Sequence, residues 1–170
     1  TDIKEDTDGI AATMRGSLND DNLSNSVGGF LKFDYDGNPV AGKYYTAPEG
    51  NTVGFGELEK VSDGWILRGY YVANDDTKSN IIVMKVDELG NIIWSKKIGG
   101  IGEENANSLL VTDELIVVAG ATSEFNIPNG DALLISLTLD GKSDDCEYIN
   151  DIDFKNKRFN DGRDLQWLVL

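Results

Sequence analysis

Short apolar or alternating runs recur along this chain, and polar segments that carry glycine separate them. Clear runs lie at residues 65–71, 81–87 and 92–98, and the turn sequence Leu-Gly-Asn at residues 89–91 joins the last two. Runs of this length bounded by turn residues are typical of antiparallel strands, and no useful helical periodicity is present. The pattern therefore predicts an all-β protein.

The strand pattern repeats about every fifty residues, a spacing typical of repeat architectures. A shift of 51 residues places Gly69 on Gly120 and also Gly90 on Gly141. A backward shift of 53 residues places Gly90 on Gly37. Because one shift aligns glycines that lie far apart in the chain, the match between segments indicates tandem copies of one unit.

We expect a single repeat domain over residues 1–170, with copies near residues 8–50, 51–100 and 101–150 and a linker plus terminal strand at 151–170. Each full copy has four antiparallel strands, here lettered A to D. The first copy is expected to lack strand A because residues 1–9 are polar, and the third is expected to end on a strand D at residues 146–149. Residues 151–160 are interpreted as loop, which gives the phase BCD-ABCD-ABCD-A.

Three motifs resemble repeats of large bacterial and archaeal secreted and cell-surface β-propellers. They are Gly-Gly-Ile-Gly-Glu-Glu-Asn-Ala-Asn-Ser at residues 99–108, Val-Asp-Glu-Leu-Gly-Asn-Ile-Ile-Trp at 86–94 and Val-Ala-Gly-Ala-Thr at 118–122. The resemblance covers about residues 8–150 and weakens in the third copy, where Asp145 replaces Trp94. It implies β-propeller-like blades and an extracellular or cell-surface setting, but no activity, because propellers host many functions.

The last residues have the place and character of one more strand A. We expect Leu165, Trp167, Leu168, Val169 and Leu170 to form a strand that pairs with a partner. Propellers typically have four to eight blades, so three copies leave a gap. The alternatives are a two-chain ring, a filament formed by strand donation, a fragment of a longer propeller, or pairing within one chain.

Charge and composition exclude several classes of function. The net charge is −15, and such a surface repels phosphate backbones, so we expect no nucleic-acid partner. No apolar run approaches the roughly 20 residues of a membrane-spanning helix, so we expect no membrane insertion. The chain has no histidine, which removes histidine-based acid–base catalysis and Ser-His-Asp triads.

Acidic loops are the candidate metal sites. Asp20 and Asp21 in the first copy match Asp75 and Asp76 in the second, and adjacent carboxylates could share a calcium ion. A solvated loop is the competing interpretation. The sequence Asp-Tyr-Asp-Gly-Asn at residues 34–38 also resembles a calcium loop, but its alignment with the other glycine turns favours a turn.

These observations lead to two hypotheses for the function. The first is a secreted structural or interaction module without enzymatic activity, which forms a homo-oligomer or a filament. The second is a carbohydrate-active enzyme with paired carboxylates, or a part of a larger ligand-binding propeller. Trp65, Trp94 and Trp167 could stack on sugars, although their apolar neighbours favour a place in the core.

Overall fold

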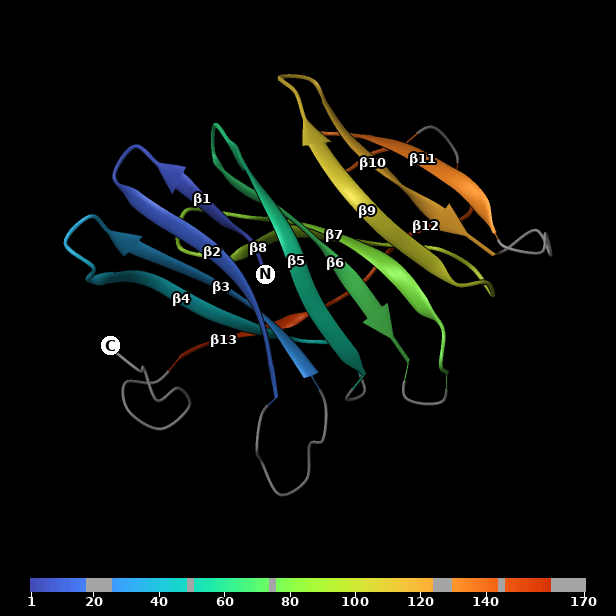
Figure 1. Cartoon of the computed structure of the whole chain (residues 1–170), viewed down its shortest axis with the longest axis horizontal. Coiled ribbons are helices and arrows are strands. Elements are labelled where there is room, and N and C mark those ends of the chain that lie inside the picture. The colour runs from blue at the N-terminus through green and yellow to red at the C-terminus, as the bar shows by residue number, and fades with distance from the viewer. Residues whose placement is uncertain (18–25, 49–50, 74–75, 124–129, 144–145, 160–170) are drawn as a thin grey trace.

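The computed structural model describes residues 1–17, 26–48, 51–73, 76–123, 130–143 and 146–159. These residues form strands and turns, and every strand pair is antiparallel (Figure 1). The strands make three sheets that follow one another along the chain, from blue through green to orange in Figure 1. The prediction of an all-β chain is confirmed.

The three sheets share one meander topology. The first sheet has the order β1-β2-β3-β4-β13, the second β12-β8-β7-β6-β5 and the third β11-β10-β9. The strands of the first sheet are β1 (Ile3–Asp6), β2 (Gly9–Ser17), β3 (Ser26–Asp34), β4 (Pro39–Thr46) and β13 (Lys155–Arg158). Those of the second are β5 (Thr52–Val61), β6 (Gly64–Val72), β7 (Ser79–Val86), β8 (Ile92–Ile98) and β12 (Ile149–Asp151). Those of the third are β9 (Glu104–Val111), β10 (Leu115–Thr122) and β11 (Asp131–Thr138).

The expectation that the first copy lacks strand A is wrong. Strand β1 pairs with β2 over four residues and takes the position that β5 and β9 have in the later sheets. Its inner side chains are charged, and Lys4 pairs with Glu59 at 2.7 Å. Because ion pairs replace apolar contacts here, the hydrophobic pattern gives no signal for this strand.

The C-terminal part also differs from the expectation. Residues 146–149 do not close the third sheet: Ile149 begins β12, which pairs with β8 of the second sheet. Residues 151–160, interpreted as loop, contain β13, which pairs with β4 of the first sheet. A strand added at a sheet edge is held by backbone hydrogen bonds, so it needs no apolar alternation. In the described part of the chain the third sheet therefore has three strands, and the phase BCD-ABCD-ABCD-A is wrong.

The sheets pack face to face through two apolar cores. We call the face of a sheet that is directed toward the next sheet its forward face, and the opposite face its backward face. Phe30 on the forward face of the first sheet lies 6.1 Å from Trp65 on the backward face of the second, measured between ring centroids. Both side chains are fully buried. A second core joins the forward face of the second sheet, through Val83, to the backward face of the third, through Ile116.

An aromatic side chain of each sheet also contacts the glycine turn of the next sheet. The Tyr45 hydroxyl donates to the carbonyl oxygen of Gly90 at 2.8 Å, and the Trp94 indole N–H donates to that of Leu139 at 3.2 Å. A Cβ on Gly141 would lie 2.8 Å from the Trp94 ring. Glycine therefore serves two purposes at these turns, because it also adopts the positive φ of 76° at Gly90 and 77° at Gly141.

Removing the Tyr45 hydroxyl tests this contact. We expect Tyr45→Phe to lower the free energy of unfolding by about 1 kcal/mol, because the Gly90 carbonyl loses its partner in a buried setting. Tyr44→Phe is the control because its hydroxyl makes no hydrogen bond with any described residue, and its effect should stay within about 0.5 kcal/mol. Urea unfolding measures both values, and equal effects would contradict the role of the hydroxyl.

Candidate assembly surfaces

The same position of the repeat is buried in two sheets and exposed in the third. Phe30, Val83 and Leu134 are related by the shifts of 53 and 51 residues and lie on the forward faces of β3, β7 and β11. Phe30 and Val83 are 0% exposed, whereas Leu134 is 74% exposed. No described residue packs on the forward face of the third sheet. Leu134 is exposed for this reason, whereas Phe30 and Val83 are covered by the next sheet.

The forward face of the third sheet is mainly apolar and uncharged in the described part of the chain. Strand alternation places on it the residues opposite to those that pack in the second core. They include Ser108, Leu110, Leu115, Val117, Ala119, Ala121, Ala132, Leu134, Ser136 and Thr138. None of these is charged, although 26% of the chain is. An exposed, uncharged sheet face on a strongly acidic protein is the candidate interaction surface.

The backward face of the first sheet shows the complementary difference. Ile10, Trp65 and Ile116 occupy equivalent positions on the backward faces of β2, β6 and β10, because they pair with Phe33, Val86 and Leu137, which the shifts of 53 and 51 residues relate. Trp65 and Ile116 are 0% exposed, whereas Ile10 is 40% exposed. Ile3, which pairs with Ala12 on the same face, is also open at 64%, whereas Leu58 at the equivalent position of β5 is 0% exposed. The first sheet therefore presents an uncovered face of the kind that the second and third sheets bury.

The glycine turn of the first sheet is equally uncovered. A Cβ on Gly90 would lie 2.9 Å from Phe30, and one on Gly141 would touch Trp94, but a Cβ on Gly37 would meet nothing within 4 Å. All three glycines have a φ between 76° and 84°. The turns are therefore equivalent in backbone, and only the aromatic partner from a preceding sheet is missing at Gly37.

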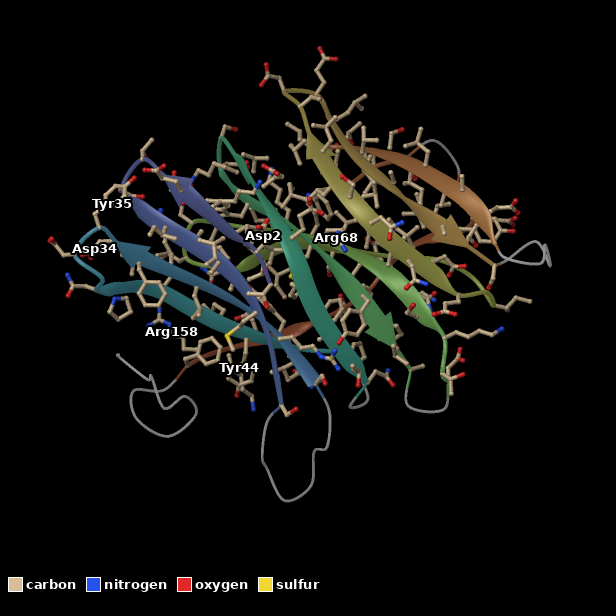
Figure 2. The ribbon with its side chains drawn as sticks, in the orientation of Figure 1. Asp2, Asp34, Tyr35, Tyr44, Arg68 and Arg158 are labelled. Carbon is tan, nitrogen blue, oxygen red and sulfur yellow. The ribbon has the colours of Figure 1, made fainter. Side chains whose placement is uncertain are left out.

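The C-terminal segment covers part of the backward face of the first sheet. The Phe159 ring lies 5.4 Å from that of Tyr44, and its Cδ2 lies 3.1 Å from where a Gly42 Cβ would be. Figure 2 shows Tyr44 on β4 and Arg158 on the adjoining β13. This cover lies at the β4 edge of the sheet, while Ile10 on β2 stays open.

Ion pairs connect the first sheet to the second. The Lys32 amine lies 2.9 Å from carboxylate oxygens of both Asp6 and Asp8, and 3.1 Å from Glu88 of the second sheet. Lys60 is a second partner of Asp6 at 3.0 Å. Burial by itself would raise the pKa of Asp6, but the hydrogen bonds from Lys32 and Lys60 outweigh it and hold that pKa well below its usual range. A lowered pKa suits an ionic crosslink and not a general acid.

Hydrogen bonds from basic side chains connect the second sheet to the third. Lys85, which matches Lys32 in the repeat, lies 2.8 Å from Asp63 and 3.4 Å from the carbonyl oxygen of Leu139. Arg68 lies between the two sheets in Figure 2 and donates to the carbonyl oxygen of Ala106 at 2.9 Å. The third sheet has Ser136 and Ala119 at the positions of Lys85 and Arg68, so its forward face is flatter and less polar.

The loop residues predicted to bind calcium are only partly described. Asp20, Asp21 and Asp75 lie outside the described residues, so the calcium hypothesis stays a prediction. Asp76 is described, and its Oδ1 accepts from the backbone N–H groups of Thr77 and Lys78 at 2.7 and 3.0 Å. Within the described ranges, no group of three or more acidic or cysteine side chains could hold a metal ion. A calcium titration followed by melting temperature tests the hypothesis.

The turn at residues 34–38 has the geometry of an Asx turn. Asp34 Oδ1 accepts from the backbone N–H groups of Asp36 and Asn38 at 3.0 and 2.8 Å, and Oδ2 accepts from the Asn38 side-chain amide at 2.9 Å. The bond from the Asn38 side chain, followed by the backbone bonds, lowers the pKa of Asp34. The preference for a turn at this sequence is confirmed. Trp65 is confirmed as a core residue, and Trp94 is partly buried against the second core.

The predicted partner strand of Leu165, Trp167, Leu168, Val169 and Leu170 lies outside the described residues. The two uncovered faces, in contrast, were not identified from the sequence. A signal for them was present, because the shift of 51 residues places Leu110 on Glu59 and Leu134 on the fully buried Val83. Comparing the copies face by face, in addition to aligning their glycines, would have shown it.

Comparison with known proteins adds no family. Neither a scan against protein-family models nor a search of the curated proteins returns a match. In the part of the chain that is described, no helix has the length and apolar character needed to cross a membrane.

Proposed function

We propose that this chain is a secreted or cell-surface structural module of β-propeller-like repeats that associates with other copies of itself. The observation that carries the proposal is the 74% exposure of Leu134 at a repeat position that is fully buried in the other two sheets. The equivalent side chains of the other two sheets are packed between sheets. An exposed leucine at this position therefore indicates that a partner covers it.

The blade-like arrangement of the sheets supports the propeller part of the proposal. Each sheet is a meander, and the first strand of each later sheet lies against the sheet before it: β5 contacts β1, β2 and β3, and β9 contacts β5, β6 and β7. The same faces, turns and aromatic contacts recur from one junction to the next. Repeats packed in this way bury their apolar faces only against neighbours, so a sheet without a neighbour stays incomplete.

The partner strand predicted at residues 165–170 belongs to the same proposal. Strand addition by this segment would give the assembly a second contact, besides the packing of sheet faces. The extracellular setting follows from the resemblance of the repeat motifs to secreted β-propellers and remains part of the proposal.

Sedimentation velocity of the unmodified chain and of Leu134→Asp tests the proposed self-association. We expect the unmodified chain to sediment as an oligomer and Leu134→Asp to associate roughly 100-fold more weakly, because an unpaired carboxylate would be buried in the contact. Circular dichroism should show that the variant keeps its fold, since residue 134 is already exposed.

Leu89→Asp provides the matched control. Leu89 is 50% exposed, but it lies in the turn between β7 and β8 and on neither uncovered face. Its replacement should leave the oligomer unchanged. A strictly monomeric unmodified chain would contradict the proposed function.

A further inference from the structure

We propose that the forward face of the third sheet packs on the backward face of the first sheet of a second copy, with Leu134 of one chain against Ile10 of the other. The inference rests on the proposed function and names the partner surface. It would make the contact between chains a repetition of the contact that already joins successive sheets within one chain.

Two junctions inside the chain define the geometry of the contact. Phe30 and Trp65, the repeat equivalents of Leu134 and Ile10, lie 6.1 Å apart at the first junction. Val83 and Ile116, the same pair of positions, share the second core at the next junction. Each forward face meets a backward face at these positions, and one forward face and one backward face remain without a neighbour in the described chain.

The side chains on the two uncovered faces suit each other. Opposite the open Ile10, the third sheet offers Leu134 and the small side chains of Ala119 and Ser136. The absence of charge on the forward face matters because two chains of net charge −15 repel each other at long range. Apolar burial at a neutral face can overcome that repulsion, whereas a charged face would add to it.

The contact between chains differs from the internal junctions at the glycine turn of the first sheet. At the internal junctions, side chains from the fourth strand of the preceding sheet lie against this turn: Tyr45 and Lys43 of β4 at Gly90, and Trp94 of β8 at Gly141. In the described part of the chain the third sheet has no fourth strand. The equivalent Gly37 is therefore not part of the inferred contact, which rests on the two sheet faces.

When two copies meet, the forward face of each third sheet can pack on the backward face of the first sheet of the other copy, so the same contact forms twice. Such a pair would hold six sheets, within the four to eight blades typical of propellers, and it would leave neither face uncovered. The arrangement is therefore a closed ring of two chains, and its mass is that of a dimer.

Mixing two variants distinguishes this contact from any other form of self-association. Leu134→Asp disables the forward face and Ile10→Asp disables the backward face. At a protein concentration at which the unmodified chain is dimeric, each variant alone should be monomeric, because both reciprocal contacts contain the altered face. An equimolar mixture should form a dimer of one chain of each kind, since one contact then has two intact faces.

The outcomes separate the inference from the proposed function. If the unmodified chain is dimeric but Ile10→Asp alone stays dimeric, or the mixture stays monomeric, this contact is overturned and the proposed function stands. If the unmodified chain is monomeric, the proposed function fails as well. Leu110→Asp and Ile3→Asp, on the same two faces, repeat the experiment with independent variants, and circular dichroism confirms that each one folds.

Discussion

Replacing Lys32 with methionine is expected to lower the free energy of unfolding by about 3 kcal/mol, because the variant removes one of the two cations that pair with the buried Asp6 carboxylate. The side chains of Lys32 and Asp6 are each only 4% exposed. Methionine keeps the apolar stem of the lysine, so the change removes charge with little change in packing volume. Lys60 still contacts Asp6 in the variant, which keeps the loss near the lower end of values for broken buried pairs.

Lys4→Met is the matched control for this prediction. Lys4 also pairs with a carboxylate of the second sheet, Glu59, but the two side chains are 37% and 31% exposed. An exposed pair contributes between zero and about 1 kcal/mol, so the control should change the stability by no more than that. Guanidinium unfolding measures both variants, and equal losses would show that the burial of Lys32 has no energetic consequence.

The effect of Lys32 should depend on pH in a definite direction. The pKa of Asp6 in the folded protein lies below its ordinary value of 3.8, so the ionised pair stabilises the fold above that value. Its contribution is lost as the pH falls from about 4 toward the lowered pKa of the folded state. The difference in stability between the unmodified chain and Lys32→Met should therefore be constant near neutral pH and shrink below about pH 4.

Replacing Gly69 with alanine is expected to destabilise the fold by about 3 kcal/mol through a backbone clash. A Cβ at this position would lie 2.1 Å from the carbonyl oxygen of Gly54 and 2.9 Å from the Phe55 ring. The close approach belongs to the irregular register between β5 and β6 near Phe55. The neighbouring backbone cannot move aside without losing its ladder of hydrogen bonds.

Gly16→Ala provides a control on β2, the strand of the first sheet that is equivalent to β6. The pairing of β1 with β2 ends at Ala12, so Gly16 pairs only with Val27 of β3, and among the described residues a Cβ there would meet only the end of Met14 at 3.7 Å. We expect Gly16→Ala to be neutral or to stabilise by a few tenths of a kcal/mol, because alanine restricts the unfolded chain. Thermal unfolding separates the two variants, and a large loss at Gly16 would contradict the structural difference between the sheets.

The all-β character and most of the strands could be predicted from the sequence because they depend on local chemistry. Gly37, Gly90 and Gly141 mark turns that need a positive φ, and alternation around them shows where the strands run. The predicted core position of Trp65 follows from its apolar neighbours. These features depend on residues close in the chain, so they are visible without knowledge of the tertiary contacts.

The edge strands could not be predicted because their stability comes from distant partners. Strand β1 is held by ion pairs such as Lys4 with Glu59, and β12 by its pairing with Ile98 and by the ion pair between Lys96 and Asp151 at 2.6 Å. Neither kind of contact leaves a hydrophobic period in the sequence. Residues 1–9 and 151–160 were therefore interpreted without strands, and the strand expected at residues 146–149 was assigned to the third sheet instead of the second.

The sequence by itself determined that this protein is all-β, with antiparallel strands joined by glycine turns, because turn chemistry and strand alternation act over a few residues. Only the tertiary structure decided which apolar positions lack a neighbour. Phe30, Val83 and Leu134 are all apolar, yet Phe30 and Val83 are buried between sheets and Leu134 is exposed. Burial depends on what packs from outside the strand, and a residue carries no local mark of whether that neighbour is present.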